Sequence, residues 1–316
     1  MPTAAIVARQ LRRVYPRAPP GVAAIDSLDL EVPSGGVYGL IGRNGAGKTT
    51  FVRIAATQLK PTSGTLEVLG TDAVRTPERV RPRIACVPQE SRPLYFLTVE
   101  QAARFNLQLR GFDRRESRRR TTEVLEELSL ADVRHRSISR LSGGQRRRVM
   151  VAMILATDAE LLFLDEPTTG LDPLARREVW AALRRVRREA RTILLTTHYL
   201  DEAESLSDRL ALIEKGRVIL EGTPAELRRR VAYPFRVTLR GGFAREELDS
   251  FGRVSSVEDG FLVFAQEPAA RELARLALER GVQVALGPAD LEDIFLEVVG
   301  RPIDAEENAP DDGERP

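Results

Sequence analysis

The sequence predicts an α/β protein whose core is a parallel or mixed sheet that carries a helical subdomain and a small C-terminal α+β appendage. Three observations support this fold class. Short apolar strands alternate with helical stretches, the order that a parallel sheet covered by helices on both faces produces. A wholly helical stretch rich in Arg and Glu interrupts the alternation over about residues 91–153. A strand pattern of alternating apolar and polar residues then starts at Phe235.

The length and composition divide the chain into three parts. Its 316 residues are enough for one large domain and a smaller one. A change of composition near residues 227–231 marks the boundary, so we expect the large domain to span 1–231 and an accessory domain to span 232–300. The tail, 301–316, holds six acidic residues and three prolines, and we expect it to be disordered.

The individual elements are predicted from apolar periodicity. Residues 36–42 form an apolar strand that ends in a glycine-rich turn, and the pattern predicts a helix over 50–59 beyond it. Further along the large domain we expect a strand over 161–164, a helix over 175–189 and a strand over 192–196. In the accessory domain we expect helices over 270–277 and 291–298, with Asp290 as the N-cap of the second helix.

Composition limits the partners and the compartment. The 48 basic and 46 acidic residues nearly cancel, so no overall field draws the protein to nucleic acid. Glutamates accompany the arginine run over 114–120, which favours a solvated helical face there. Cys86 is the one cysteine, which excludes an internal disulfide and a cysteine-clustered zinc site and fits a reducing cytoplasm. The apolar run 149–156 is far shorter than the roughly 18–20 residues that cross a bilayer, so we expect membrane contact only through a partner.

The residues at the end of the strand predicted over 36–42 and directly after it have the spacing of a phosphate-binding loop. Its glycines let backbone N–H groups approach phosphates, and the helix that follows points its positive end at them. Lys48 would bring its charge to the β and γ phosphates, and the Thr49 hydroxyl can hold magnesium. Chance gives about 0.002 matches to this pattern in such a chain. The nucleotide-binding residues expected here are Gly42, Arg43, Asn44, Gly45, Ala46, Gly47, Lys48, Thr49 and Thr50.

Two carboxylates end the apolar strand at 161–164. The carboxyl edge of a parallel sheet is where open α/β folds bind their ligands. Asp165 would bind magnesium through water, and Glu166 would orient and deprotonate an attacking water molecule. An Asp-Glu pair after a strand can also be a simple turn signal, but the phosphate-binding loop earlier in the chain favours the catalytic interpretation.

Taken together, these motifs resemble the nucleotide-binding subunit of ABC transporters. The resemblance covers about residues 5–225 and rests on the phosphate loop and four further motifs in this order: Leu141–Gln145, Asp165–Glu166, Gly170–Asp172 and Thr196–His198. It implies an ATP- and Mg²⁺-dependent ATPase that works as a head-to-tail dimer with a second copy of itself. In that dimer, Ser142, Gly143, Gly144 and Gln145 would contact the γ phosphate bound by the opposite subunit. A helix N-terminus that carries small residues suits such an anion.

The resemblance also implies roles for residues whose local signal is weak. Gln89 would sense magnesium and the attacking water, in a loop that touches the membrane partner, although alone it would be a surface turn. His198 would hydrogen-bond the γ phosphate, although a strand can end in an ordinary histidine. Tyr15 would stack on adenine, or could equally be a core or rim aromatic. Asp172 lies in a loop that would contact the second copy.

Two segments favour one branch of this family. Tyr199–Glu204 and Leu291–Leu296 resemble the drug-resistance and antibiotic-export branch, typified by daunorubicin-resistance ATPases. The resemblance implies a cytoplasmic ATPase at the inner face of the cell membrane that powers a separate membrane permease. The cargo would be a drug, an antibiotic or another hydrophobic compound, with sodium, polysaccharide or lipid as alternatives. A soluble ABC ATPase acting on DNA or ribosomes is disfavoured because the chain has one cassette and no room for coiled-coil arms.

Overall fold

The structure is a computed structural model that describes residues 4–16, 21–87, 95–188, 191–230, 232–257 and 259–299. The chain forms two compact units, Met1–Glu221 and Gly222–Pro316. This division lies ten residues before the boundary expected after residue 231 (231 minus 221). The reason is that helix α8 (Pro224–Arg230) packs against α11 (Leu291–Val299) within the second unit. The expected tail, 301–316, lies outside the described residues.

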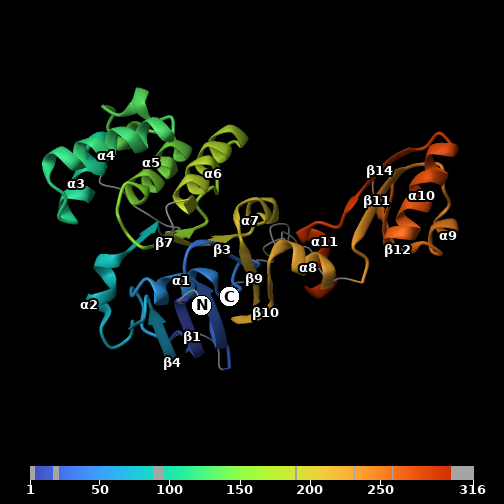
Figure 1. The fold of residues 1–316 in the computed structure, drawn as a ribbon, viewed down its shortest axis with the longest axis horizontal. Coiled ribbons are helices and arrows are strands. Elements are labelled where there is room, and N and C mark those ends of the chain that lie inside the picture. The colour runs from blue at the N-terminus through green and yellow to red at the C-terminus, as the bar shows by residue number, and fades with distance from the viewer. Residues whose placement is uncertain are drawn as a thin grey trace, which may run out of the picture. The chain divides into compact units, whose positions relative to one another are not determined.

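The first unit contains two sheets, and both are visible in Figure 1. An antiparallel sheet has the order β2-β1-β4-β5, with strands β1 (Ala4–Arg13), β2 (Ile25–Pro33), β4 (Ser63–Val68) and β5 (Thr71–Asp72). A six-stranded sheet has the order β10-β9-β3-β8-β7-β6, with strands β3 (Gly36–Ile41), β6 (Ile84–Val87), β7 (Leu161–Asp165), β8 (Thr192–Thr197), β9 (Arg209–Glu214) and β10 (Arg217–Gly222). The pairs β3/β8, β3/β9, β6/β7 and β7/β8 are parallel, as the sequence predicted.

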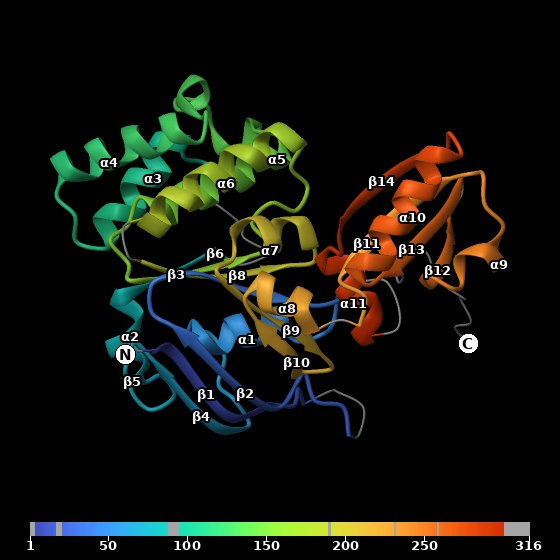
Figure 2. The same cartoon turned by 45° about the vertical axis from the view of Figure 1, so that its right-hand side comes forward.

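Helices cover both faces of the six-stranded sheet, and Figure 2 shows α1 between the two sheets with α3 to α6 beyond the opposite face. The helices of this unit are α1 (Lys48–Ala55), α2 (Pro77–Val80), α3 (Val99–Leu109), α4 (Arg114–Glu127), α5 (Gly143–Leu155), α6 (Pro173–Arg188) and α7 (Leu200–Leu206), with short 3₁₀ turns at Arg81–Arg83, Ala131–Val133 and Ile138–Arg140. One apolar cluster lies around α1 between the sheets, and another joins the sheet to α3, α4, α5 and α6. Strands β7 and β8 are buried along their whole length, which explains the apolar run of β7 and the three consecutive apolar residues in β8.

Helix α1 is shorter than the sequence predicted. It ends at Ala55, not at residue 59. Thr57 adopts the left-handed region with φ 59°, which a continuing α-helix does not allow. The residues that the sequence assigned to the end of this helix form a turn in which the Thr57 N–H donates to the Ile54 carbonyl.

The second unit is a small α+β structure. Its antiparallel sheet has the order β12-β13-β11-β14, with strands β11 (Phe235–Arg240), β12 (Gly252–Val257), β13 (Gly260–Ala265) and β14 (Gln283–Pro288). Helix α10 (Glu267–Glu279) packs on this sheet, and the short α9 (Arg245–Leu248) precedes β12. The Asp290 carboxylate accepts from the Asp293 N–H at 3.0 Å and caps α11, as predicted. Among the described residues no helix is long and apolar enough to cross a membrane.

Candidate active site

The phosphate-binding loop joins the end of β3 to the start of α1 and is shaped by glycine. A Cβ atom placed on Gly42 would lie 2.3 Å from the Ile213 carbonyl oxygen, and one on Gly47 would lie 2.5 Å from the Ala24 carbonyl oxygen. Gly47 also has φ 110°, a conformation that side chains strongly disfavour. Among the described residues no side chain caps the N-terminus of α1, so its backbone donors face the loop. These features fit a bound phosphate.

Three charged or titratable side chains meet beside this loop. Lys48 Nζ donates to the carbonyls of Gly42 at 2.6 Å and Arg43 at 3.1 Å, and lies 3.7 Å from Glu166 Oε1. His198 Nδ1 lies 3.3 Å from the same carboxylate oxygen. Lys48 and Glu166 are each 4% exposed, so these charges interact away from bulk water. The structure therefore brings together the three residues that the sequence assigned to the triphosphate and to the general base.

Burial and pairing set the protonation of this group. Burial lowers the pKa of Lys48, and the carboxylates of Glu166 and Asp165 oppose that shift. Burial alone would raise the pKa of Glu166, but the hydrogen bond with His198 and the charge of Lys48 outweigh it, so its pKa lies below the ordinary value. A carboxylate that is ionised at neutral pH is the form that can accept a proton.

Asp165 lies at the end of β7 between two threonine hydroxyls. The Thr196 hydroxyl donates to Asp165 Oδ1, and Thr49 makes a second side-chain hydrogen bond with this carboxylate. Asp165 is 1% exposed, and burial raises its pKa although both hydroxyls oppose that shift. A buried carboxylate next to a threonine hydroxyl is a donor set that suits a hard divalent cation such as Mg²⁺. The site thus joins the two described residues that the sequence assigned to metal.

The backbone of Glu166 is strained, and no sequence motif indicates which contacts stabilise this conformation. Glu166 has φ 50°, in the left-handed region that non-glycine residues rarely adopt. Its N–H donates to the carbonyl of Thr196 at 3.0 Å and to the Thr196 hydroxyl at 3.1 Å. The Thr169 hydroxyl lies 3.3 Å from Glu166 Oε2. Thr169 is therefore a site residue that motif reading missed, because a threonine in a turn carries no distinctive pattern. Thr196 belongs to the Thr196–His198 motif, but the motif assigned no role to its hydroxyl or carbonyl.

Tyr15 lies close to the phosphate-binding loop. Its hydroxyl is 3.3 Å from the Thr50 hydroxyl, one residue beyond Thr49, and its ring is covered by the Arg13 guanidinium at 4.9 Å. This half-buried ring, two residues beyond the end of β1, is therefore near the first turn of α1. Gln89, by contrast, lies outside the described residues.

The Leu141–Gln145 motif forms the start of α5. Ser142 and Gly143 are exposed there. The Ser142 hydroxyl accepts from the Gln145 N–H, and the Gln145 side chain accepts from the Ser142 N–H, each at 3.1 Å, so the two residues form a capping box. A Cβ placed on Gly144 would lie 3.2 Å from Leu171 Cδ2, which puts this glycine against the Gly170–Asp172 loop. Within one chain, Ser142 and Gln145 thus hydrogen-bond each other, and Gly144 packs against the Gly170–Asp172 loop.

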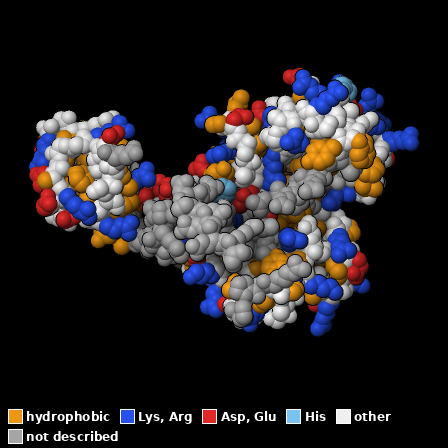
Figure 3. Space-filling view, turned by 180° about the vertical axis from the view of Figure 1, so that it is seen from behind, with side chains coloured by type: hydrophobic (Ala, Val, Ile, Leu, Met, Phe, Trp, Pro, Cys, Tyr) orange, Lys and Arg blue, Asp and Glu red, His pale blue; other side chains and the backbone are white. Residues whose placement is uncertain are grey.

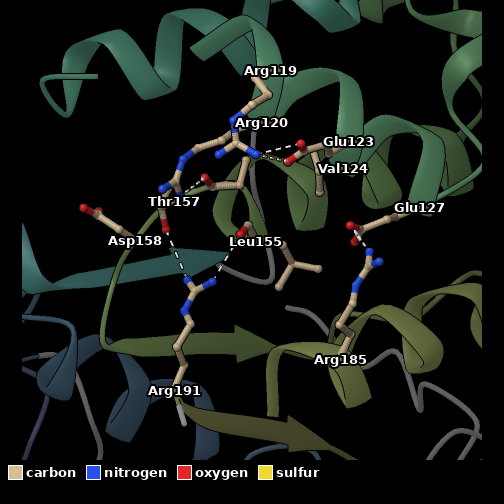
Figure 4. Close-up of a pocket in the computed structure, with 11 residues that line it drawn as sticks. Arg119, Arg120, Glu123, Val124, Glu127, Leu155, Thr157, Asp158, Arg185 and Arg191 are labelled. Atoms are coloured by element: carbon tan, nitrogen blue, oxygen red, sulfur yellow. Dashed lines mark hydrogen bonds and ion pairs between the residues drawn. The ribbon is translucent and has the colours of Figure 1, made fainter. Parts of the chain in front are cut away.

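A cavity of about 470 Å³ lies at the other end of α5, and Figure 4 shows the arginines that line it. Their charges are already engaged. Arg119 pairs with Glu116 and Glu123, and Arg185 pairs with Glu127. The remaining two, Arg120 and Arg191, donate to backbone carbonyls. The arginine-rich surface is therefore tied into ion pairs and helix ends, which agrees with the solvated helical face expected from the sequence.

Comparison with known proteins gives a consistent picture. A family model described as ABC transporter matches residues 25–169. The daunorubicin/doxorubicin resistance ATP-binding protein DrrA of Streptomyces peucetius is 39% identical to this chain, over 96% of this chain and 94% of the relative. The Nod factor export ATP-binding protein I of Cupriavidus metallidurans is 36% identical, over 95% of this chain and 98% of the relative. A solved ATP-binding subunit of an ABC transporter aligns with a TM-score of 0.65 and 28% identity, over 72% of this chain and 93% of its own. A bacterial ABC transporter cassette, solved as a dimer, aligns with a TM-score of 0.65 and 23% identity over 69% of this chain and 98% of its own.

Proposed function

Because this chain belongs to the ABC transporter family and is an ATP-hydrolysing cassette, we propose that it powers a separate membrane permease that exports a drug, an antibiotic or another hydrophobic compound. The observation that carries the proposal is the buried cluster in which Lys48 and His198 both approach Glu166 beside the phosphate-binding loop. The choice of cargo follows the names of the relatives, which include drug-resistance and Nod factor export proteins. Sodium, polysaccharide and lipid remain the alternative cargoes.

The residues of one chain divide the work of hydrolysis. The loop N–H groups and Lys48 bind the β and γ phosphates of ATP, and Tyr15 stacks on the adenine. Glu166 accepts a proton from the water whose oxygen forms the new bond to the γ phosphorus, while the bond between that phosphorus and the bridging oxygen breaks. His198 donates to the γ phosphate. Thr49, Gln89 and Asp165 would hold Mg²⁺, which would supply positive charge against the phosphate oxygens.

A second copy of the chain completes each site in this proposal. Ser142 and Gly143 are exposed at the N-terminus of α5, where backbone donors and the helix dipole attract an anion. A head-to-tail dimer would bring this end of α5, with Gly144 and Gln145, to the γ phosphate held by the partner, and Asp172 to the same interface. The dimer seen for a cassette of the same fold supports this arrangement.

The membrane permease has a candidate docking surface along α3 and the residues just before it. Phe96 is 79% exposed and Phe105 is 44% exposed. Both line a groove whose apolar residues are flanked by polar ones: Phe96, Leu97, Gln101, Arg104, Phe105 and Gln108. On the helical subdomain, Figure 3 shows hydrophobic side chains exposed beside basic ones. Apolar side chains gathered on one surface of a protein typically mark a partner. We place the protein at the inner face of the cell membrane, in contact with it through this permease and without nucleic acid as a partner.

The test is Glu166→Gln, which removes the base but keeps the shape of the side chain. ATP binding should persist while turnover falls by about 10²- to 10⁴-fold, the usual contribution of a general base. Glu160→Gln is the matched control, because Glu160 directly precedes the same strand and pairs with Arg83 at the surface. Normal hydrolysis by the Glu166 variant would show that the base is misassigned. A loss of turnover as large in the Glu160 variant would point to misfolding.

A further inference from the structure

Arg147, two residues beyond the Leu141–Gln145 motif, binds the backbone that carries the catalytic carboxylates. Its Nη2 donates to the Asp165 carbonyl and, at 2.6 Å, to the Glu166 carbonyl. Its Nε donates to the Pro167 carbonyl at 3.3 Å. One guanidinium from α5 therefore holds three consecutive carbonyls at the point where β7 ends.

These hydrogen bonds lie at the strained backbone around Glu166. Glu166 is in the left-handed region at φ 50°, so the chain turns away from the strand direction there, although the Glu166 N–H still donates to the Thr196 carbonyl of β8. A planar guanidinium offers several donors in a fixed fork and can bind adjacent carbonyls at once, which a lysine ammonium on a flexible stem does less well. The geometry thus links the orientation of Glu166 to an arginine on the neighbouring helix.

A second contact joins the same two segments. The backbone at Gly144 packs closely against Leu171, since a Cβ placed there would lie 3.2 Å from Leu171 Cδ2. The start of α5 is therefore in contact with both ends of the loop that runs from Glu166 to Asp172. A shift of this end of α5 cannot leave that loop unchanged.

The far end of α5 is fixed by two other arginines, which Figure 4 shows. Arg120 of α4 donates to the Ala156 carbonyl at 3.2 Å, and Arg191 donates to the Leu155 carbonyl at 3.2 Å. Cations at a helix C-terminus are favourable because they oppose the negative end of the helix dipole. Because hydrogen bonds hold its C-terminal end in this way, a displacement at the N-terminus of α5 would also move Arg147 and the carbonyls that it binds.

We propose that Arg147 is a positioning residue that couples the Ser142 end of α5 to Glu166 of the same chain. This inference rests on the proposed function, in which that end of α5 binds the γ phosphate held by the partner. Nucleotide contact in one composite site would then set the orientation of the general base in the other. The two ATP sites of the dimer are linked through a single side chain and the peptide groups that it binds.

The first test compares Arg147→Gln and Arg147→Lys with Arg148→Gln. Arg148 is the matched control because it lies next to Arg147 on α5 and also binds a backbone carbonyl, but its hydrogen bonds go to Leu128 and Glu178 instead of the carbonyls of residues 165–167. We expect kcat to fall by about 10- to 100-fold in both Arg147 variants, the loss that a displacement of about 1 Å causes. KM for ATP and binding of a nonhydrolysable ATP analogue should stay within about twofold.

The possible results distinguish a positioning role of Arg147 from a merely structural role, and a failure of this inference from a failure of the proposed function. Turnover within twofold of wild type in Arg147→Gln would overturn the inference, as would an equal loss of kcat in Arg148→Gln. Rescue of kcat by Arg147→Lys would also overturn it, because charge alone would then suffice. If the wild-type chain itself fails to hydrolyse ATP, the proposed function fails first.

A second test decides which site Arg147 serves, with two differently tagged chains purified as mixed dimers. The reference dimer carries Glu166→Gln in one chain, which leaves one active base. Adding Arg147→Gln to the chain with the intact Glu166 should lower the reference turnover by the same 10- to 100-fold, whereas adding it to the Glu166→Gln chain should leave it within about twofold. Equal rates in the two arrangements, or the reverse order, would overturn the assignment.

Discussion

Gly47→Ala is the most direct test of the structure of the phosphate-binding loop. The structure shows both contributions to its effect on the free energy of unfolding, which are backbone strain and steric overlap. Gly47 has φ 110°, and an L side chain in such a conformation costs about 1–3 kcal/mol. The new Cβ would also lie 2.5 Å from the Ala24 carbonyl oxygen and 3.0 Å from Ile25 Cδ1. Forcing a methyl group into packed surroundings adds about 1–3 kcal/mol. We therefore expect Gly47→Ala to destabilise the protein by about 2–6 kcal/mol.

Gly45→Ala is the matched control for this substitution. Gly45 also has a positive φ, 79°, but a Cβ placed on it meets nothing within 4 Å. We therefore expect Gly45→Ala to lower the free energy of unfolding only through backbone strain, by about 1–3 kcal/mol. Urea unfolding of both variants measures the difference, and ATP binding should be lost more severely in Gly47→Ala because the loop must move to relieve the contact. Equal destabilisation by the two variants, or a neutral Gly47→Ala, would refute this account of the loop.

Three further predictions concern other parts of the chain. Burial raises the pKa of Glu202 above its ordinary 4.5, so the free energy of unfolding falls as the pH rises from 4.5 through the raised pKa. Glu202→Gln should become more stable relative to wild type over that pH range. Parallel pH profiles of the two proteins in urea unfolding would contradict this. Thr196→Val removes one of the two threonine hydroxyls that donate to the buried Asp165 and should lower the free energy of unfolding by about 1–3 kcal/mol with reduced turnover, so an equally stable and active variant would argue against that contact. Phe96→Ser with Phe105→Ser should abolish co-purification with the permease while free ATPase activity stays within about twofold and stability within about 0.5 kcal/mol; undiminished co-purification would exclude this surface.

The sequence was a good guide where the signal is local. The phosphate-binding loop and the strand that ends in Asp165 are each defined by a few consecutive residues, and their spacing reflects backbone geometry that those residues impose. Strand β8 could likewise be predicted, because its central Ile-Leu-Leu run and β-branched threonines are typical of a strand buried on both faces. The parallel arrangement of these strands then followed from the helices between them.

Features that depend on distant contacts were not predictable. The antiparallel sheet pairs β1 with both β2 and β4, and no local pattern states which strands meet. The unit boundary falls at Glu221 because α8 packs on α11, some 60 residues later in the chain. Arg147 is one of many arginines in the sequence, and its importance lies in carbonyls that only the folded chain brings to it.

The central claim is that ATP is held between two copies of this chain, and Glu166→Gln permits a direct measurement. Because this variant should bind ATP without hydrolysing it, sedimentation equilibrium should give the mass of the 35.1 kDa monomer with ADP and twice that mass with ATP and Mg²⁺. Adding Ser142→Arg should prevent the ATP-dependent dimer by blocking the start of α5. A Glu166→Gln protein that binds ATP yet remains a monomer at every concentration tested would contradict the claim.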